Sequence, residues 1–263
     1  MKTGPRDILS ARPDGLADSI GRSLGALGPA LAAVIVWVVA FVVMGAAIIG
    51  LGLLLTRVLL PAGLGAEDAS WSRWFVTERT PTLNTMTAIS SALGSSGVIL
   101  TLSVIAGVAL VIGRYGRQLA FLFFALTLEF AVFLVTTMIV GRHRPTVPQL
   151  DVAPPTSSFP SGHTASALTL YVGAAIVLTS LVRGTLARTL VWALAILLPI
   201  GVAISRLYRG MHFPTDVTAS VLLSVAALLF ALLAVRSMAA AADARDRRAA
   251  PPPPVNSPPE VTS

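Results

Sequence analysis

Residues 31–55 decide the fold: they read LAAVIVWVVAFVVMGAAIIGLGLLL and carry no charged side chain. A helix needs about 20 apolar residues to cross the hydrocarbon core of a bilayer. The run is far longer than the core of a signal peptide, and no small-residue cleavage site ends it. We therefore expect a retained transmembrane helix here.

Five further segments have a similar apolar character and sufficient length: 97–113, 119–140, 162–182, 187–205 and 215–235. The connections 114–118 and 183–186 are as short as those of helical hairpins. The longer connection, 57–96, holds Trp71 and Trp74, which are expected at the lipid–water boundary. The sequence thus predicts an all-α, polytopic membrane protein with six transmembrane helices.

The composition of the 263 residues supports this fold class, with 55% hydrophobic and 12% charged residues and a mean hydropathy of +0.81. A soluble domain normally carries about 25% charged residues, so an ordinary cytosolic enzyme and a disordered protein are both excluded. The absence of Cys excludes thiolate metal sites and a disulfide scaffold. The net charge of +7 comes from residues scattered between apolar segments, which predicts control of membrane topology and no nucleic-acid partner.

The distribution of basic residues favours a cytoplasmic location for both termini. In that topology the cytoplasmic side holds 12 Lys and Arg and the other side holds 7, four of them in polar motifs. The expected organisation is a cytoplasmic N-terminal segment, 1–30, a six-helix membrane domain, 31–235, and a cytoplasmic tail, 236–263. The tail ends in PPPPVNSPPEVTS, which cannot bury a core, and is expected to be disordered.

Three polar stretches interrupt the apolar pattern: GRHRP at 141–145, SFPSGH at 158–163 and SRLYRGMHFPTD at 205–216. The six-helix topology places all three on the extracytoplasmic face, where we expect the active site. They contain all three His residues of the chain and four of its Arg residues. Such a concentration on one face is difficult to explain by loop solvation alone.

These residues suit a phosphate group. Arg144 and Arg206 offer planar, permanently charged guanidinium groups. Ser161, Gly162 and His163 begin the fourth predicted helix, where free backbone N–H groups and the positive end of the helix dipole face an anion.

The His residues suit covalent catalysis, as a nucleophile and a general acid. Asp216 follows His212 by four residues, within reach to fix its tautomer. No cluster of carboxylates lies nearby, so we expect neither a metal nor another cofactor.

The order of these motifs resembles the type 2 phosphatidic acid phosphatase superfamily, which also includes the vanadium-dependent haloperoxidases, and within it the integral-membrane bacterial branch. Arg-Pro comes first, then Pro-Ser-Gly-His at 160–163, then Ser-Arg-x5-His-x3-Asp at 205–216. The resemblance covers roughly residues 31–235. The long third motif at a fitting distance makes it specific.

The resemblance implies that His212 attacks phosphorus and forms a phosphohistidine, while Asp216 orients it. His163 would protonate the leaving oxygen and then activate water, with no metal required. The phosphoryl oxygens would be held by Arg144, Arg206, Ser161 and the amide of Gly162.

One position departs from the family pattern. The first motif of the family begins with Lys seven residues before the Arg of Arg-Pro, and here Thr137 stands at that position. Arg142 or Arg209, both expected on the same face, could supply the missing cationic contact. A weaker site or a shifted substrate preference are the alternatives.

Two other polar residues need an interpretation. Glu129 lies within a predicted span and is expected in its cytoplasmic half, far from the site, with a hydrogen bond to a neighbouring helix or with a protonated side chain. A role in lipid or proton handling is the alternative. His143 matches no fixed family position, and loop solvation is the favoured interpretation.

The sequence predicts a membrane lipid phosphatase in the cell membrane. Its substrate would carry a phosphomonoester or pyrophosphate, as do polyprenyl diphosphates, phosphatidic acid and phosphatidylglycerol phosphate, with undecaprenyl diphosphate as the leading guess. One alternative moves the phosphoryl group to another lipid or sugar, and another is a non-catalytic lipid-binding or transport protein. A vanadate-dependent peroxidase is less favoured, because those relatives are generally soluble. The oligomeric state is left open.

Overall fold

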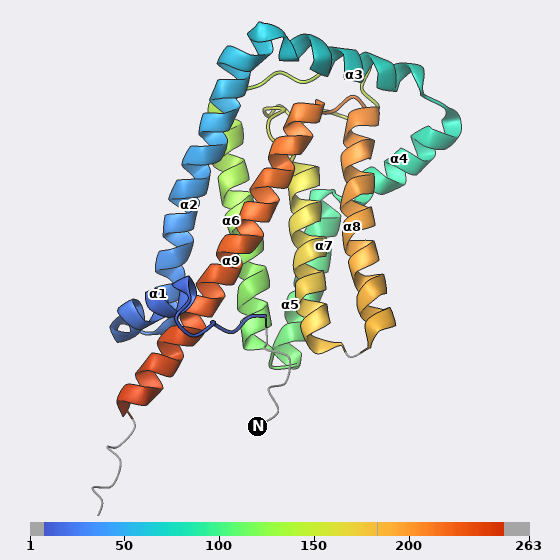
Figure 1. The fold of residues 1–263 in the computed structure, drawn as a ribbon. Helices are drawn as coiled ribbons and strands as arrows, with labels where there is room; N and C mark the ends of the chain where they lie inside the picture. The colour runs from blue at the N-terminus through green and yellow to red at the C-terminus, as the bar shows by residue number, and fades with distance from the viewer. Residues whose placement is uncertain (1–7, 183, 250–263) are drawn as a thin grey trace, which may run out of the picture.

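Nine α-helices form the part of the chain that the structure, a computed structural model, describes, namely residues 8–182 and 184–249 (Figure 1). They are α1 (Leu16–Leu24), α2 (Pro29–Leu54), α3 (Gly65–Thr77), α4 (Pro81–Leu93), α5 (Ser96–Ile112), α6 (Gly116–Val140), α7 (Gly162–Leu181), α8 (Thr185–Tyr208) and α9 (Pro214–Ala249). A short 3-10 turn, η1 (Gly25–Leu27), precedes α2, and a wide helical segment, η2 (Leu55–Leu64), follows it.

The helices confirm an all-α, polytopic membrane protein. Within the described residues, five are long and apolar enough to cross a bilayer: α2 with its continuation, α6, α7, α8 and α9. The pair α4 and α5, bent by 45°, forms a sixth candidate span if it is counted as one. The predicted span 97–113 is therefore one arm of a broken helix.

The longest helix, α9, is central to the bundle and packs against α1, α2, α6 and α7 (Figure 1). Two apolar clusters flank it. One is built around Phe121 and Leu170, and the other around Leu128, Phe159 and Leu223. The loops between α6 and α7 and between α8 and α9 meet at the end of the bundle that α3 crosses, which we call the α3 end.

Residues 57–96 are mostly helical, whereas the sequence favoured a connecting loop. The apolar helix α2 ends in η2, which contains Pro61 and Gly63, the latter with φ of +124°. After this kink α3 lies across the bundle end (Figure 1). The buried face of α3 is polar, with Asp68 and Ser72, so the apolar stripe that normally reveals an amphipathic helix is missing.

The predicted disordered tail also differs from the structure, because α9 continues to Ala249. The Ala-rich turns after residue 235 pack on α1, where Gly21 lies so close to Ala240 that a Cβ at this glycine would be 2.5 Å from the Ala240 Cβ. Arg236 also donates through Nε to the carbonyl of Ile8, at 2.9 Å. The proline-rich end of the tail, 250–263, and the first seven residues lie outside the described residues.

Candidate active site

The α3 end brings the three sequence motifs together (Figure 1). The first lies in the loop after α6, the second spans the start of α7, and the third spans the end of α8 and the start of α9. Hydrogen bonds link them directly, since Arg144 donates to the carbonyl of Met211 at 2.9 Å and the hydroxyl of Ser158 donates to the carboxylate of Asp216 at 2.5 Å. The predicted site residues are therefore neighbours in space.

His212 is buried, and its two ring nitrogens face different partners. Nδ1 lies 2.8 Å from the backbone carbonyl of Ser158. A carbonyl can only accept, so Nδ1 carries the proton and Nε2 keeps its lone pair. Nε2 lies 3.4 Å from Nη1 of Arg144. Burial lowers the pKa of His212, and the nearby carboxylate of Asp216 opposes this only in part, so the ring is neutral near pH 7.

Asp216 is fully buried in the first turn of α9. It accepts hydrogen bonds from the hydroxyl of Ser158 at 2.5 Å and the amide of Phe213 at 2.9 Å, and it forms an ion pair with Arg142. Its carboxylate is 3.8 Å from Nδ1 of His212. Asp216 thus organises the segments on both sides of His212. We expected Asp216 to accept the hydrogen bond from Nδ1–H, but the carbonyl of Ser158 accepts it.

The start of α7 is closely packed. The Ser161 hydroxyl shares a hydrogen bond with Thr164 at 3.0 Å. A Cβ at Gly162 would lie 2.8 Å from Phe133 of α6, so the absence of a side chain is required for helix packing there. His163, the next residue, lies against the bend between α4 and α5, where a Cβ at Gly94 would be 2.9 Å from the His163 carbonyl. The first-turn amides of α7 have no intrahelical carbonyl to bind.

Two guanidinium groups carry donors without partners. Within the described part of the chain, the Nε atoms of Arg144 and Arg206 are buried and have no hydrogen-bond acceptor. Arg206 otherwise donates through Nη1 to the hydroxyl of Ser91 at 2.7 Å and to Asp151 at 2.8 Å. Buried donors of this kind are costly unless a ligand satisfies them, and a phosphate matches them in charge and geometry.

Arg142 and Arg209, the two proposed substitutes for the family Lys, are both engaged by carboxylates. Arg142 lies between Asp216 and Asp68, and Arg209 donates to Asp151 through Nε at 2.8 Å and Nη2 at 2.6 Å.

Thr137, at the position of the family Lys, is buried within α6. Its hydroxyl donates to the carbonyl of Leu134 at 2.9 Å. It therefore acts as a packing residue, and its side chain replaces no charge.

Asp68 and Asp151 are the site residues that sequence reasoning missed. Both lie in segments without a motif, so neither has a local signal in the sequence. Burial raises the pKa of Asp151, but hydrogen bonds from Arg209 and Arg206 and their charges lower it by more, so its net pKa lies below the ordinary value. Asp151 is therefore ionised at neutral pH and compensates one of the two guanidinium charges.

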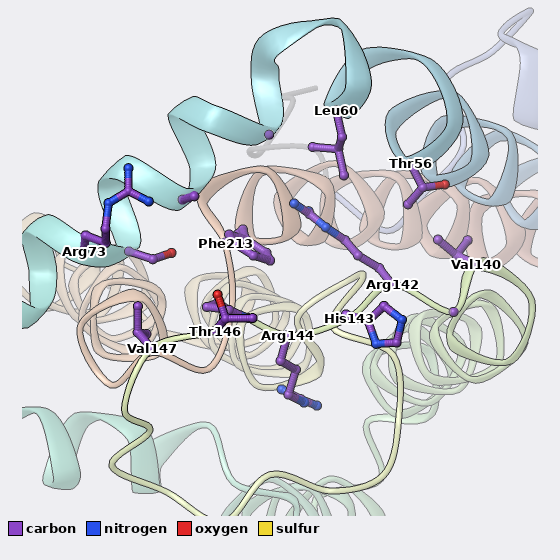
Figure 2. Close-up of a pocket in the computed structure, with 15 residues that line it drawn as sticks. Thr56, Leu60, Arg73, Val140, Arg142, His143, Arg144, Thr146, Val147 and Phe213 are labelled. Atoms are coloured by element: carbon purple, nitrogen blue, oxygen red, sulfur yellow. The ribbon is translucent and has the colours of Figure 1, made fainter.

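A cavity of about 460 Å³ adjoins this centre between η2, α3 and residues 140–147 (Figure 2). Arg142 reaches across it toward α3, while Arg144 points the opposite way. Apolar side chains and Arg73 and His143 complete much of its lining. His163 and His212 are outside this lining, so the cavity is a neighbouring compartment that shares Arg144 with the reacting centre.

Glu129 is closer to the site than its sequence position suggested. Its carboxyl accepts a hydrogen bond from Ser166 at 3.3 Å, which agrees with the predicted bond to a neighbouring helix. Ser166 follows His163 by one turn of α7, so Glu129 lies one helical turn below the candidate active site. The placement in the far half of the span was wrong, because α6 extends beyond the start of α7, with Phe133 opposite Gly162.

Comparisons with known proteins identify one family model and two similar crystal structures. The sequence model of the PAP2 superfamily matches residues 118–238. The structure is similar to the crystal structure of a transmembrane PAP2-type phosphatidylglycerolphosphate phosphatase from Bacillus subtilis, with a TM-score of 0.59, 28% identity, and coverage of 76% of this chain and 92% of that chain. A second match is LpxE from Aquifex aeolicus, with a TM-score of 0.47, 27% identity, and coverage of 61% and 92%. A search of curated proteins finds no match.

Proposed function

The chain is a member of the PAP2 superfamily, and on that premise we propose that it is a membrane lipid phosphatase that works through a phosphohistidine on His212. The observation that carries the proposal is the state of His212. A neutral ring whose Nδ1–H is bound to Ser158 presents the Nε2 lone pair toward Arg144, where a phosphoryl group would bind. The geometry supports a nucleophile.

In the first half-reaction, Nε2 of His212 attacks phosphorus and the bond to the leaving oxygen breaks. His163 donates a proton to that oxygen, which leaves as the lipid alcohol or lipid phosphate. Arg144 and Arg206 bind the phosphoryl oxygens with the donors that are otherwise unpaired.

In the second half-reaction, His163 accepts a proton from water, whose oxygen attacks phosphorus. The P–N bond breaks, inorganic phosphate leaves and His212 returns to its neutral form. The proton that His163 gave up in the first step is thereby restored.

The α3 end faces the extracytoplasmic side in this proposal, with both termini in the cytoplasm. The support is the excess of Arg and Lys in the segments at the opposite end of the bundle. The lipid tail would stay in the bilayer while the head group enters between the loops.

The cavity beside Arg144 supports a substrate whose head group extends beyond one phosphate. It is lined by basic and apolar side chains and is large enough for a glycerol or a second phosphate. Phosphatidylglycerol phosphate and polyprenyl diphosphates such as undecaprenyl diphosphate have such head groups, and phosphatidic acid lacks one.

The decisive experiment measures phosphate release by detergent-purified protein in excess EDTA, with each of these lipids. Wild type is compared with His212→Ala, His163→Ala and the distant surface variant Arg117→Ala. We expect activity in wild type and Arg117→Ala and none in His212→Ala. With a ³²P-labelled lipid, His163→Ala should retain an acid-labile label on the protein that His212→Ala lacks. Full phosphate release by His212→Ala would overturn the proposal, and label found on an added alcohol would indicate phosphotransfer.

A further inference from the structure

We propose that Asp68 of α3 is a positioning residue for this reaction, which acts through Arg142 and keeps the buried charge beside His212 net negative. The inference rests on the proposed function. Asp68 lies outside the residues matched by the PAP2 sequence model, in a helix that the sequence did not predict.

Asp68 is only 2% exposed and is bound on both sides. One oxygen pairs with Nη2 of Arg142 at 2.6 Å and accepts the Thr215 hydroxyl at 2.5 Å. The other accepts the Thr215 amide at 3.4 Å. Nη1 of Arg142 binds Asp216 and the Thr215 hydroxyl. A single guanidinium thus joins the carboxylate of α3 to the carboxylate that organises the His212 loop.

The charges of this cluster have a consequence for the nucleophile. Arg142 paired with Asp216 alone would be neutral, whereas Asp68, Arg142 and Asp216 together carry one net negative charge. Buried charge that is not neutralised costs free energy, so the cluster is expensive as a purely structural device. Of the three residues in the cluster, Asp216 lies beside His212, with its carboxylate 3.8 Å from Nδ1.

In the proposed reaction His212 becomes a positively charged phosphoimidazole. The net negative charge of Asp68, Arg142 and Asp216 stabilises this cation. The other charged or titratable groups around the ring are Arg144, Arg206 and His163, which cannot stabilise a cation. Asp151 compensates part of this positive charge at Arg206. The cluster places a carboxylate 3.8 Å from Nδ1 of His212, and its net negative charge depends on Asp68. Asp68 therefore stabilises the intermediate without contact with the substrate.

Asp68→Asn tests this, because the amide has the same shape and lacks the charge. We expect kcat to fall about tenfold, the order for one charge separated from the ring by Arg142 and Asp216, with KM changed less than about twofold. The acid limb of the pH profile of kcat/KM should move to lower pH, because the loss of a negative charge disfavours the protonated form of His212. Arg142→Gln should move it to higher pH. Glu67→Gln removes the adjacent exposed carboxylate and should change neither kcat nor the position of the acid limb.

Opposite shifts of the acid limb in Asp68→Asn and Arg142→Gln are the signature of a charge effect, and Asp68→Glu, which keeps the charge, should restore the limb. An acid limb that stays in place in either variant overturns the inference, whether or not the melting temperature falls. If one variant does not fold, the sign of the shift in the other decides. Failure of the proposed function can be distinguished from failure of this inference, because in the former case the wild-type protein itself would release no phosphate in EDTA.

Discussion

The backbone carbonyl of Ser158 lies 2.8 Å from Nδ1 of His212 and so holds the ring in the tautomer that frees Nε2. The carboxylate of Asp216 is farther from the same nitrogen, at 3.8 Å, and instead accepts the hydroxyl of Ser158 and the amide of Phe213. The ring of His212, the proposed nucleophile, is therefore oriented by the main chain at Ser158, and Asp216 in turn positions that main chain. On the proposed mechanism, we expect activity to depend on Asp216 through both of these segments.

Asp216→Asn should lower kcat by about two orders of magnitude or more, because the amide cannot accept from Ser158, Phe213 and Arg142 together and brings no charge. Ser158→Ala should cost less, about tenfold, since the carbonyl that binds His212 remains. Steady-state phosphate release measures both. A larger loss in Ser158→Ala than in Asp216→Asn would show that the hydroxyl has a role beyond Asp216.

The reaction should remain active below the ordinary His pKa of about 6.5. Burial lowers the pKa of His212, so the Nε2 lone pair persists as the pH falls, and the acid limb lies at a lower pH. Because the pKa of His212 is lower in the folded than in the unfolded chain, protonation of His212 favours unfolding. The free energy of unfolding should therefore decline as the pH falls below about 6.5. Rates and melting temperatures at each pH separate the two effects. An acid limb above 6.5 in folded protein would contradict the neutral, buried ring.

Gly94→Ala should impair both stability and activity. A Cβ there would lie 2.6 Å from Val202 and 2.9 Å from the carbonyl of His163, so α7 or α8 must shift. Overpacking of this kind costs about 1–3 kcal/mol. The matched control is Gly97→Ala, three residues along, where a Cβ meets open space and little change is expected. Melting temperature and kcat in detergent check the pair, and equal behaviour of the two variants would contradict the close contact.

Asp151→Asn should strengthen product inhibition by inorganic phosphate severalfold. Asp151 compensates one of the charges of Arg206 and Arg209, so its removal raises the net charge of this group from one to two. Arg209 keeps bonds to the carbonyls of Leu150 and Asn84, which hold it in place. The inhibition constant of phosphate measures the effect. Weaker inhibition would mean that Asp151 mainly orients Arg206.

The parts of the fold that could be predicted are those with a strong local signal. Strongly apolar runs of about 20 residues identify α2 and α6 to α9, since few other structures accommodate them. The three motifs predicted which His and Arg residues lie close together at the α3 end. The α4–α5 bend and α3 had no such signal, because a bend depends on packing around Gly94 and the buried face of α3 is polar.

The missing site residues show the same limit. Asp68 and Asp151 act through Arg142 and Arg206, which lie 74 and 55 residues away, so their roles exist only after folding. The last turns of α9 were assigned to a tail because an Ala- and Arg-rich sequence has no apolar stripe. Their stability comes from close packing of small side chains against α1.

Helix α9 has 36 residues and so is about 54 Å long, well beyond the roughly 30 Å of a bilayer core. Its first turn carries Asp216, and its last turns carry the partner surface of α1, past the other helices (Figure 1). Because α9 has no break along this length, we expect a change in how α1 docks to alter the tilt or rotation of the turn that holds Asp216. The two ends of the bundle would then be coupled through one helix.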